Sequence, residues 1–254
     1  MIFDIQTFTI FLIGIFSAYF GTFTSGGVSV LGVGLLTLLG IGPQLATITF
    51  KFGKIGDTLG WLYLFYKNGH IKSRFLLAGG MMVLFGSFLG SYIIFSISSW
   101  IIYVVSALSM LVLVAVSYYK KTGAEPMTHI SQKRVYMYYI SLFFLSFFGN
   151  IFIAGSGVWY YFNNTFVLRL SALEAKWTAT AMTIFWLIGT IAGVLLQWQY
   201  NLTWWLALAL GMLIWGYLGT RHIIALGNQI FRRILLGSII VFALYFFYLS
   251  YTSY

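Results

Sequence analysis

The sequence predicts an all-α polytopic membrane protein, because three features of its 254 residues agree on that class. Hydrophobic residues make up 61% of the chain, and charged residues make up only 7%. A water-soluble domain of this length needs a far more highly charged surface. The apolar residues also gather in stretches of about 20, the length that an α-helix needs to cross a bilayer.

Eight apolar stretches are long enough to span a membrane, and each is expected to form a helix. The first begins near Thr7 without a basic segment or a small-residue cleavage site before it, so it predicts a retained helix rather than a signal peptide. Two shorter apolar stretches, 28–41 and 156–168, are too short to span comfortably. The long stretches lie near residues 6–24, 43–66, 75–95, 98–118, 136–152, 172–196, 203–220 and 229–250.

A polar linker at 119–135, which holds Pro126, divides the chain into a first transmembrane repeat, 1–118, and a second, 136–254. The two halves carry similar motifs in the same order, and one duplication explains all of them. The alternative is chance similarity among helices rich in Gly and Phe. The matching motifs are FGTFTSGG with FGNIFIAGSG, ATITFK with AKWTAT, and FGSFLGS with WGYLGT.

Basic residues cluster in loops that do not correspond between the halves. One cluster follows the second long stretch (67–74), one fills the linker, and one precedes the last long stretch (221–233). The corresponding loops of the other half, 197–201 and 96–99, carry no charge. Because cytoplasmic loops collect Lys and Arg, this asymmetry predicts inverted repeats with a cytoplasmic linker. Inversion requires an odd number of crossings per half, so the short stretches are expected to cross as broken helices.

The glycine-rich stretches TSGGVSVLGVG (24–34) and AGSG (154–157) predict breaks in helices at membrane depth. Each glycine weakens a helix by about 1 kcal/mol. A helix N-terminus freed in this way presents N–H donors and positive partial charge, which suits an anion. The alternative is that these glycines only allow close helix packing, which is the role we expect for Gly86 and Gly90. The predicted donors at the breaks are Ser25, Gly26, Gly27, Gly155 and Ser156.

Three charged residues interrupt the second long stretch: Lys51, Lys54 and Asp57. At 1.5 Å per residue from Pro43, the two lysines lie roughly 12 and 16 Å along the helix and share one face. A charge at such depth costs about 2.5–3.5 kcal/mol and normally faces a partner or a cavity. Asp57 is expected to neutralise Lys54, whereas Lys51 has no evident acidic partner and an anionic substrate would supply one. The alternative is a structural lysine that bonds the carbonyls of a broken helix.

Hydroxyl residues accompany these lysines in both halves. Thr47 and Thr49 precede Lys51, and Thr178 follows Lys176 at the matching place in the second half. We therefore expect a substrate site that contains Lys51, Lys54, Thr49 and Thr178 together with the donors at the breaks. Asp57 and Lys176 are expected to act in support or in ion coupling.

These motifs resemble the TauE/SafE family, which is also called the sulfite exporter or TSUP family. The segment from Gly27 to Ile71 resembles its opening repeat, and the likeness continues in FFGNIFIAGSG, LEAKWTATA and LGTRHIIALGNQIFRRIL. The resemblance covers nearly the whole chain, although each motif alone is weak. The residues that match the pattern of the first repeat are Gly32, Gly34, Pro43, Ala46, Thr49, Lys51, Gly69 and His70.

The resemblance implies a multi-pass transporter with two repeats in the inner membrane of a bacterium or archaeon. Substrates in the family are mostly sulfur oxyanions and sulfonates, such as sulfite, sulfoacetate and thiosulfate. Val33 stands within a run that is often three glycines, and Phe50 stands where a polar residue is common. Either difference can change the substrate, so the resemblance supports an anion transporter more strongly than a sulfite transporter.

The expected function is a secondary transporter for small organic or sulfur-containing anions, coupled to the proton gradient. An anion channel fits the same features. An intramembrane enzyme is the third alternative, but AGSG lacks the glycine that a rhomboid-type serine motif needs at Ile153. The chain has no cysteine, three histidines and four acidic residues, so we expect no enzyme activity, metal or cofactor. The expected partners are the lipid bilayer and a small anion, not nucleic acid, and the sequence leaves homo-oligomerisation open.

Overall fold

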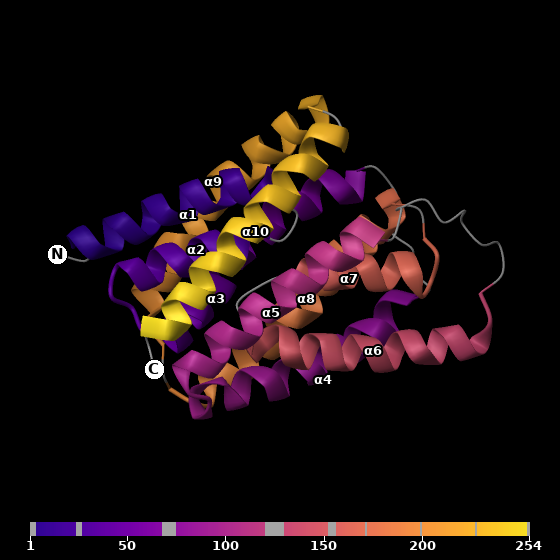
Figure 1. Ribbon diagram of the computed structural model, residues 1–254, viewed down its shortest axis with the longest axis horizontal. Helices are drawn as coiled ribbons and strands as arrows, with labels where there is room; N and C mark the ends of the chain where they lie inside the picture. The colour runs from indigo at the N-terminus through magenta and orange to yellow at the C-terminus, as the bar shows by residue number, and fades with distance from the viewer. Residues whose placement is uncertain are drawn as a thin grey trace.

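The protein is all-α in the part that the computed structural model describes, which is residues 4–23, 27–67, 75–119, 130–151, 156–170, 172–198, 200–226 and 228–252. This part forms ten α-helices and no β-strand (Figure 1). The helices are α1 (Ile5–Phe23), α2 (Gly27–Leu38), α3 (Pro43–Lys67), α4 (Leu76–Ile93), α5 (Ser99–Tyr119), α6 (Gln132–Ile151), α7 (Ser156–Phe166), α8 (Ala172–Leu195), α9 (Leu202–Leu226) and α10 (Asn228–Thr252).

The eight long helices and the two short ones occupy the predicted places, which confirms the all-α prediction. Two boundaries differ from expectation. Helix α6 begins at Gln132 and so includes Lys133 and Arg134 from the predicted linker, and α9 continues to Leu226 instead of ending near residue 220. A helix continues wherever its backbone hydrogen bonds are made, whereas hydropathy marks only the apolar part of it.

In both halves, separate helices flank the predicted glycine-rich break, whose own residues 24–26 and 152–155 lie outside the described part. Helix α1 ends at Phe23 and α2 begins at Gly27, while α6 ends at Ile151 and α7 begins at Ser156. The two short helices have 12 and 11 residues. At 1.5 Å per residue they are roughly 18 and 16 Å long, well short of a bilayer's hydrocarbon core of about 30 Å.

A residue with left-handed backbone conformation follows each of the two short helices within three residues of its end. Gly40 has φ of 81°, and Arg169 has φ of 51°. At the C-terminal end of α2, the N–H of Ile41 donates to the carbonyl of Leu36, and the N–H of Gly40 donates to the carbonyl of Thr37. This pair of hydrogen bonds is the Schellman pattern. Gly40 and Arg169 are separated by the same number of residues as Ala46 and Ala175, the alanines that align the two halves of the sequence.

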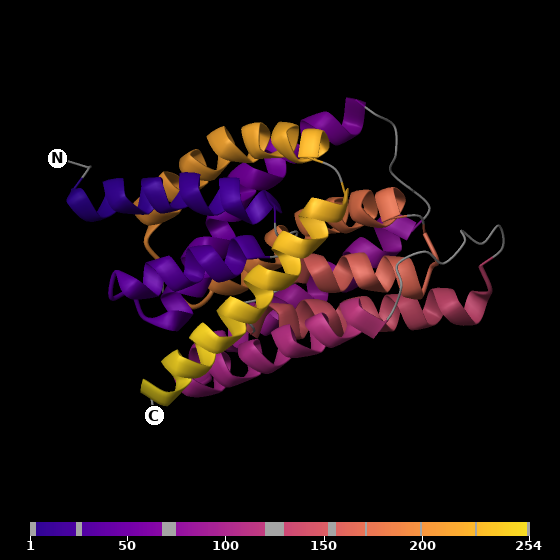
Figure 2. The same cartoon turned by 45° about the horizontal axis from the view of Figure 1, so that its top comes forward.

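The helices of the two sequence halves interlock in space. Helix α1 packs along α9, and α4 packs against both α6 and α8. Helix α3 contacts α9 and α8, and α10 runs beside α5 (Figures 1 and 2). Helices α1 to α5 have counterparts in α6 to α10, in the same order. The pair α1–α9 therefore corresponds to the pair α6–α4, and the pair α4–α8 corresponds to the pair α9–α3. The inverted orientation of the halves stays a prediction.

Most buried apolar side chains form two clusters, and each cluster contains residues from both halves of the sequence. Helix α3 contributes to both, because Phe50 belongs to the first and Ile55 packs against the second. The first cluster includes Ile10, Leu36, Phe50, Tyr103, Leu208 and Phe246. The second includes Val83, Leu142, Tyr160, Met182 and Trp186.

Glycines set the close approach of the central helices, as predicted for Gly86 and Gly90. A Cβ atom on Gly86 would lie 2.3 Å from the carbonyl oxygen of Phe143, and one on Gly90 would lie 2.2 Å from that of Phe147, both on α6. On the other side of α4, a Cβ on Gly189 would lie 2.1 Å from Ser87 Oγ. Helix α4 is therefore packed between α6 and α8 through small residues.

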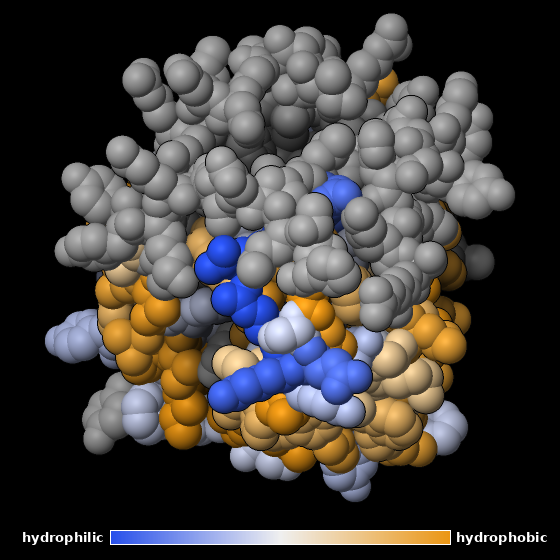
Figure 3. All heavy atoms as spheres, turned by 90° about the vertical axis from the view of Figure 1, so that its right-hand side faces the viewer, coloured by the Kyte–Doolittle hydropathy of each residue, from blue (hydrophilic) through white to orange (hydrophobic). Residues whose placement is uncertain are grey.

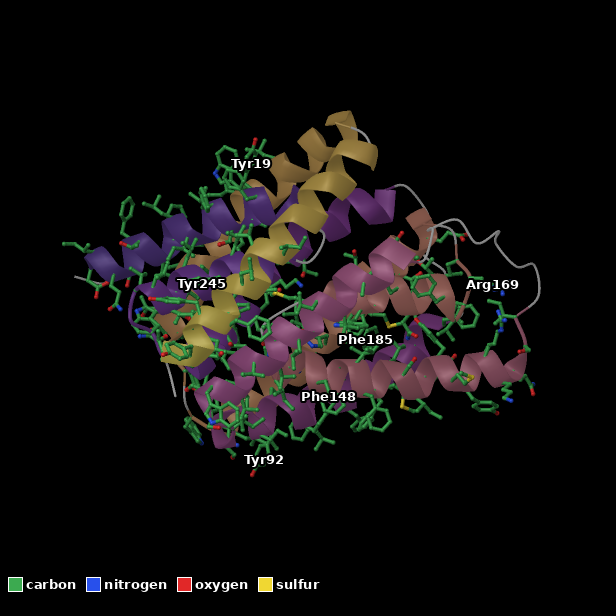
Figure 4. The ribbon with its side chains drawn as sticks, viewed as in Figure 1. Tyr19, Tyr92, Phe148, Arg169, Phe185 and Tyr245 are labelled. Carbon is green, nitrogen blue, oxygen red and sulfur yellow. The ribbon has the colours of Figure 1, made fainter. Side chains whose placement is uncertain are left out.

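The outer surface suits a bilayer. Large apolar side chains are exposed along the sides of the helices, including Tyr92 (46% exposed) and Phe148 (44%), which Figure 4 shows at the edge of the molecule. Hydrophilic side chains gather at the end of the molecule near Arg169, between hydrophobic sides (Figure 3). Among the described residues, the stretches Leu76–Ser96 and Thr178–Leu195 are long and apolar enough to cross a membrane.

Gly86→Ala is expected to destabilise the protein by roughly 1–3 kcal/mol, because its methyl group would force α4 away from α6. Gly237→Ala on α10 is the matched control, since no atom lies within 4 Å of its Cβ position. That change should be neutral or stabilising by up to about 1 kcal/mol, the difference in helix propensity. Melting temperatures in detergent measure both effects, and equal values for the two variants would contradict the packing role of Gly86.

Candidate functional site

Lys51, Lys54 and Asp57 of α3 lie in the interior, as predicted. Lys51 is 4% exposed and Asp57 is 6% exposed, while Lys54 is half-buried. Both lysine ammonium groups stand over the ring of Trp186 on α8, with Nζ 5.7 Å (Lys51) and 5.6 Å (Lys54) from its centroid. The two lysines therefore share one face, and that face meets α8. Figure 4 marks Phe185, which precedes Trp186 in the sequence, near the middle of the molecule.

Lys51 is held by the broken end of α6. Its ammonium donates a hydrogen bond to the carbonyl oxygen of Asn150. Asn150 belongs to the last turn of α6, whose final carbonyls lack partners within the helix and carry negative partial charge. This contact is the one that the structural alternative for Lys51 predicted, a lysine bonded to a carbonyl of a broken helix.

The Asn150 side chain fixes this carbonyl in place through α4 and α8. Its Nδ2 donates to the carbonyl of Ser87 (2.7 Å), and its Oδ1 accepts from Thr190 Oγ1 (3.0 Å). The Thr190 hydroxyl also lies 2.7 Å from the carbonyl oxygen of Trp186, one turn earlier on α8. A network of buried hydrogen bonds thus connects Lys51, the end of α6 and the Trp186 turn.

Charge balances differently at the two lysines. Asp57 is near enough to Lys54 for electrostatic attraction, and the ion pair expected from their spacing stays a prediction. Lys51 and Lys54 repel each other across the site. The Lys51 ammonium contacts a helix carbonyl and an aromatic ring. These contacts offset only part of the free-energy cost of burying the ammonium, because neither group carries a full negative charge.

A small cavity lies where these groups meet. The cavity volume that the centre of a water molecule can occupy is about 10 Å³. This is room for roughly one water molecule. Helices α2, α3, α6 and α8 all contribute to its wall, so the start of α2 and the end of α6 meet there. The wall consists of Ser29, Val33, Thr47, Phe50, Lys51, Lys54, Gly149 and Trp186.

Three threonine hydroxyls of α3 and α8 are buried without a hydrogen-bond partner among the described residues, on Thr47, Thr49 and Thr178. Each of these residues is 0% exposed. Thr47 lies in the cavity wall, whereas the predicted site residues Thr49 and Thr178 are absent from its described lining. A buried hydroxyl without a partner costs about 1–3 kcal/mol, which marks Thr47 as a donor available to a ligand.

The remaining predicted site residues are placed only in part. Gly27 and Ser156 begin α2 and α7, and Lys176 lies on α8, but the side chains of Ser156 and Lys176 are outside the described part. Ser25, Gly26 and Gly155 also lie outside the described residues. Within the described chain no group of three or more His, Asp or Glu residues could hold a metal ion.

Sequence analysis missed Trp186 and Asn150. Aromatic residues are frequent in this chain, and nothing in the sequence distinguishes Trp186 from the other eight tryptophans of the chain. Asn150 could have been identified from the sequence, because an asparagine in an apolar helix just before a glycine-rich break needs buried hydrogen-bond partners.

Asp57→Asn is expected to lower the melting temperature, because it leaves the half-buried Lys54 charge without its carboxylate, at a cost of roughly 1–3 kcal/mol. The double variant Lys54→Met/Asp57→Asn should recover part of that loss, since it removes both charges. Additive losses in the double variant would show that the two residues do not interact.

The comparisons with known proteins agree with this architecture. A family model described as "Sulfite exporter TauE/SafE" matches residues 10–246, which is more than half of the chain. No curated protein and no solved structure matches. The apolar helices, the glycine-rich breaks and the family match lead to one conclusion: the chain belongs to the sulfite exporter TauE/SafE family and is a membrane transport protein.

Proposed function

We propose that this protein is a secondary transporter that carries a small sulfur-containing or organic anion, such as sulfite, a sulfonate or thiosulfate, across the cell membrane of a bacterium or archaeon. One observation carries the proposal. The described wall of the buried cavity contains two lysine ammonium groups and no carboxylate. Buried positive charge without an acidic residue in the wall is the electrostatic complement of an anion.

The Lys51 contact supplies a mechanism for binding. In this conformation a carbonyl dipole of Asn150 satisfies the ammonium. A substrate oxyanion forms stronger, charge-assisted hydrogen bonds and so replaces that carbonyl. Because the cavity has room for about one water, its walls must separate to admit the substrate. Binding is thereby linked to movement of the end of α6 relative to α3.

The position of the site suits alternating access. It lies between α3 and α8, which are counterparts in the proposed inverted repeats, and next to the broken ends of α2 and α6. Transporters with inverted repeats bind their substrates at such a junction of broken helices. Rocking of one repeat against the other would expose the two lysines to each side of the membrane in turn.

Lys51→Gln is expected to abolish uptake of labelled sulfite into proteoliposomes, because an amide cannot supply the positive charge. Lys133→Gln is the matched control, since Lys133 is an exposed lysine at the start of α6. The control should retain wild-type flux, and both variants should insert and fold. Wild-type flux in Lys51→Gln would contradict the role of Lys51, and no uptake of sulfite, thiosulfate or small sulfonates by the wild type would contradict the proposed substrate class.

A proton gradient is expected to increase the initial rate of sulfite uptake, and that rate should saturate with sulfite concentration. The same proteoliposomes measure both properties when the internal pH is varied at constant external pH. Flux that rises linearly with sulfite and ignores the gradient would instead indicate an anion channel.

A further inference from the structure

Trp186 has an unused hydrogen-bond donor at the site. The residue is 2% exposed, and its indole Nε1–H has no acceptor among the described residues. Buried tryptophans normally pair this group, because leaving a donor unsatisfied costs about 1–3 kcal/mol. Trp186 also belongs to the wall of the cavity, so an unsatisfied donor accompanies the two ammonium groups there.

The ring of Trp186 also lies under both ammonium groups, at 5.7 Å from Lys51 Nζ and 5.6 Å from Lys54 Nζ. The electron-rich face attracts cations, so the ring lessens the cost of placing two like charges together. Its position in α8 corresponds to that of Asp57 in α3 when Ala46 is aligned with Ala175. The second half therefore presents a neutral aromatic residue where the first presents a carboxylate, and the described cavity wall contains no carboxylate.

We propose that Trp186 binds the substrate directly, by donating its indole N–H to a substrate oxygen while its ring face supports the two lysines. This inference rests on the proposed anion transport and adds a specificity-determining residue to it. Thr47, whose hydroxyl is also unpartnered, provides a further donor in the same wall. Residues with charged and neutral donors in the wall of one small cavity suit a compact oxyanion with several oxygens, such as sulfite.

Trp186→Phe tests the proposal, because phenylalanine keeps an aromatic face and removes only the N–H donor and part of the ring. The variant is expected to raise the KM for sulfite uptake about tenfold or more, the effect of losing a hydrogen bond to a charged group. Trp205→Phe is the matched control. Trp205 is also 2% exposed with an unpartnered Nε1–H, but it lies on α9 in the first apolar cluster and outside the described cavity wall.

The KM of Trp205→Phe should stay within a factor of two of the wild-type KM. An unchanged KM in Trp186→Phe, with wild-type protein active, would overturn the role of Trp186 and leave the proposed transport intact. Equal increases in both variants would also overturn it, because they would indicate a general effect of losing a buried tryptophan. Absence of uptake of every anion tested by the wild type would instead overturn the proposed function, and the inference with it.

A measurement on the wild-type protein covers the case in which Trp186→Phe does not fold. The indole N–H groups of the nine tryptophans give separate signals in a ¹⁵N-labelled sample in detergent. Added sulfite should move one buried indole signal downfield, and Trp186→Tyr, which keeps a ring without the indole nitrogen, should lack that signal. No sulfite-dependent shift in a wild-type protein that transports sulfite would overturn the proposal.

Discussion

Burial of the Lys51 charge is the constraint on which the rest of the site depends. A lysine that is 4% exposed within a membrane helix needs partners that offset the lost hydration of its ammonium group. The protein provides a carbonyl at the broken end of α6 and the face of Trp186. The carbonyl is available to the ammonium because it lies in the last turn of α6, where helix carbonyls have no partner within the helix. The lysine and this carbonyl come from different halves of the sequence.

Close helix packing through small residues makes the contact between Lys51 and the end of α6 possible. Gly86 and Gly90 bring α4 against α6, and Gly189 brings α8 against the other side of α4. Asn150 then reaches a backbone carbonyl on α4 and a threonine on α8. A methyl group at any of these glycines would separate the helices that the Asn150 network joins. The glycines thus act on the site from a distance, by fixing the spacing that its hydrogen bonds need.

The fold could be predicted from the sequence more completely than the site. Hydropathy located all ten helices because length and apolarity are local properties, and the glycine-rich runs marked the breaks for the same reason. The depth of Lys51 and the shared face with Lys54 also follow from helix geometry. Trp186 could not be assigned in this way, since its role arises from a helix that meets α3 only after folding, whereas Asn150 was identifiable as a polar residue beside a glycine-rich break. Thr49 and Thr178 match between the halves in sequence, yet Thr47 is the threonine found in the described cavity wall.

Under the proposed function, the asymmetry between the two halves would explain how a duplicated protein holds one anion rather than two. Lys51 and Lys54 of α3 correspond to Thr180 and Thr183 of α8, and Asp57 corresponds to Trp186. One half therefore carries the charge, and the other carries neutral groups that can face it without repulsion. Two lysine-bearing halves would place four ammonium groups at one junction, and the Coulombic cost would far exceed what one small anion offsets. In the proposed transporter, the neutral threonine and tryptophan side chains of the second half would thus permit a single central anion site.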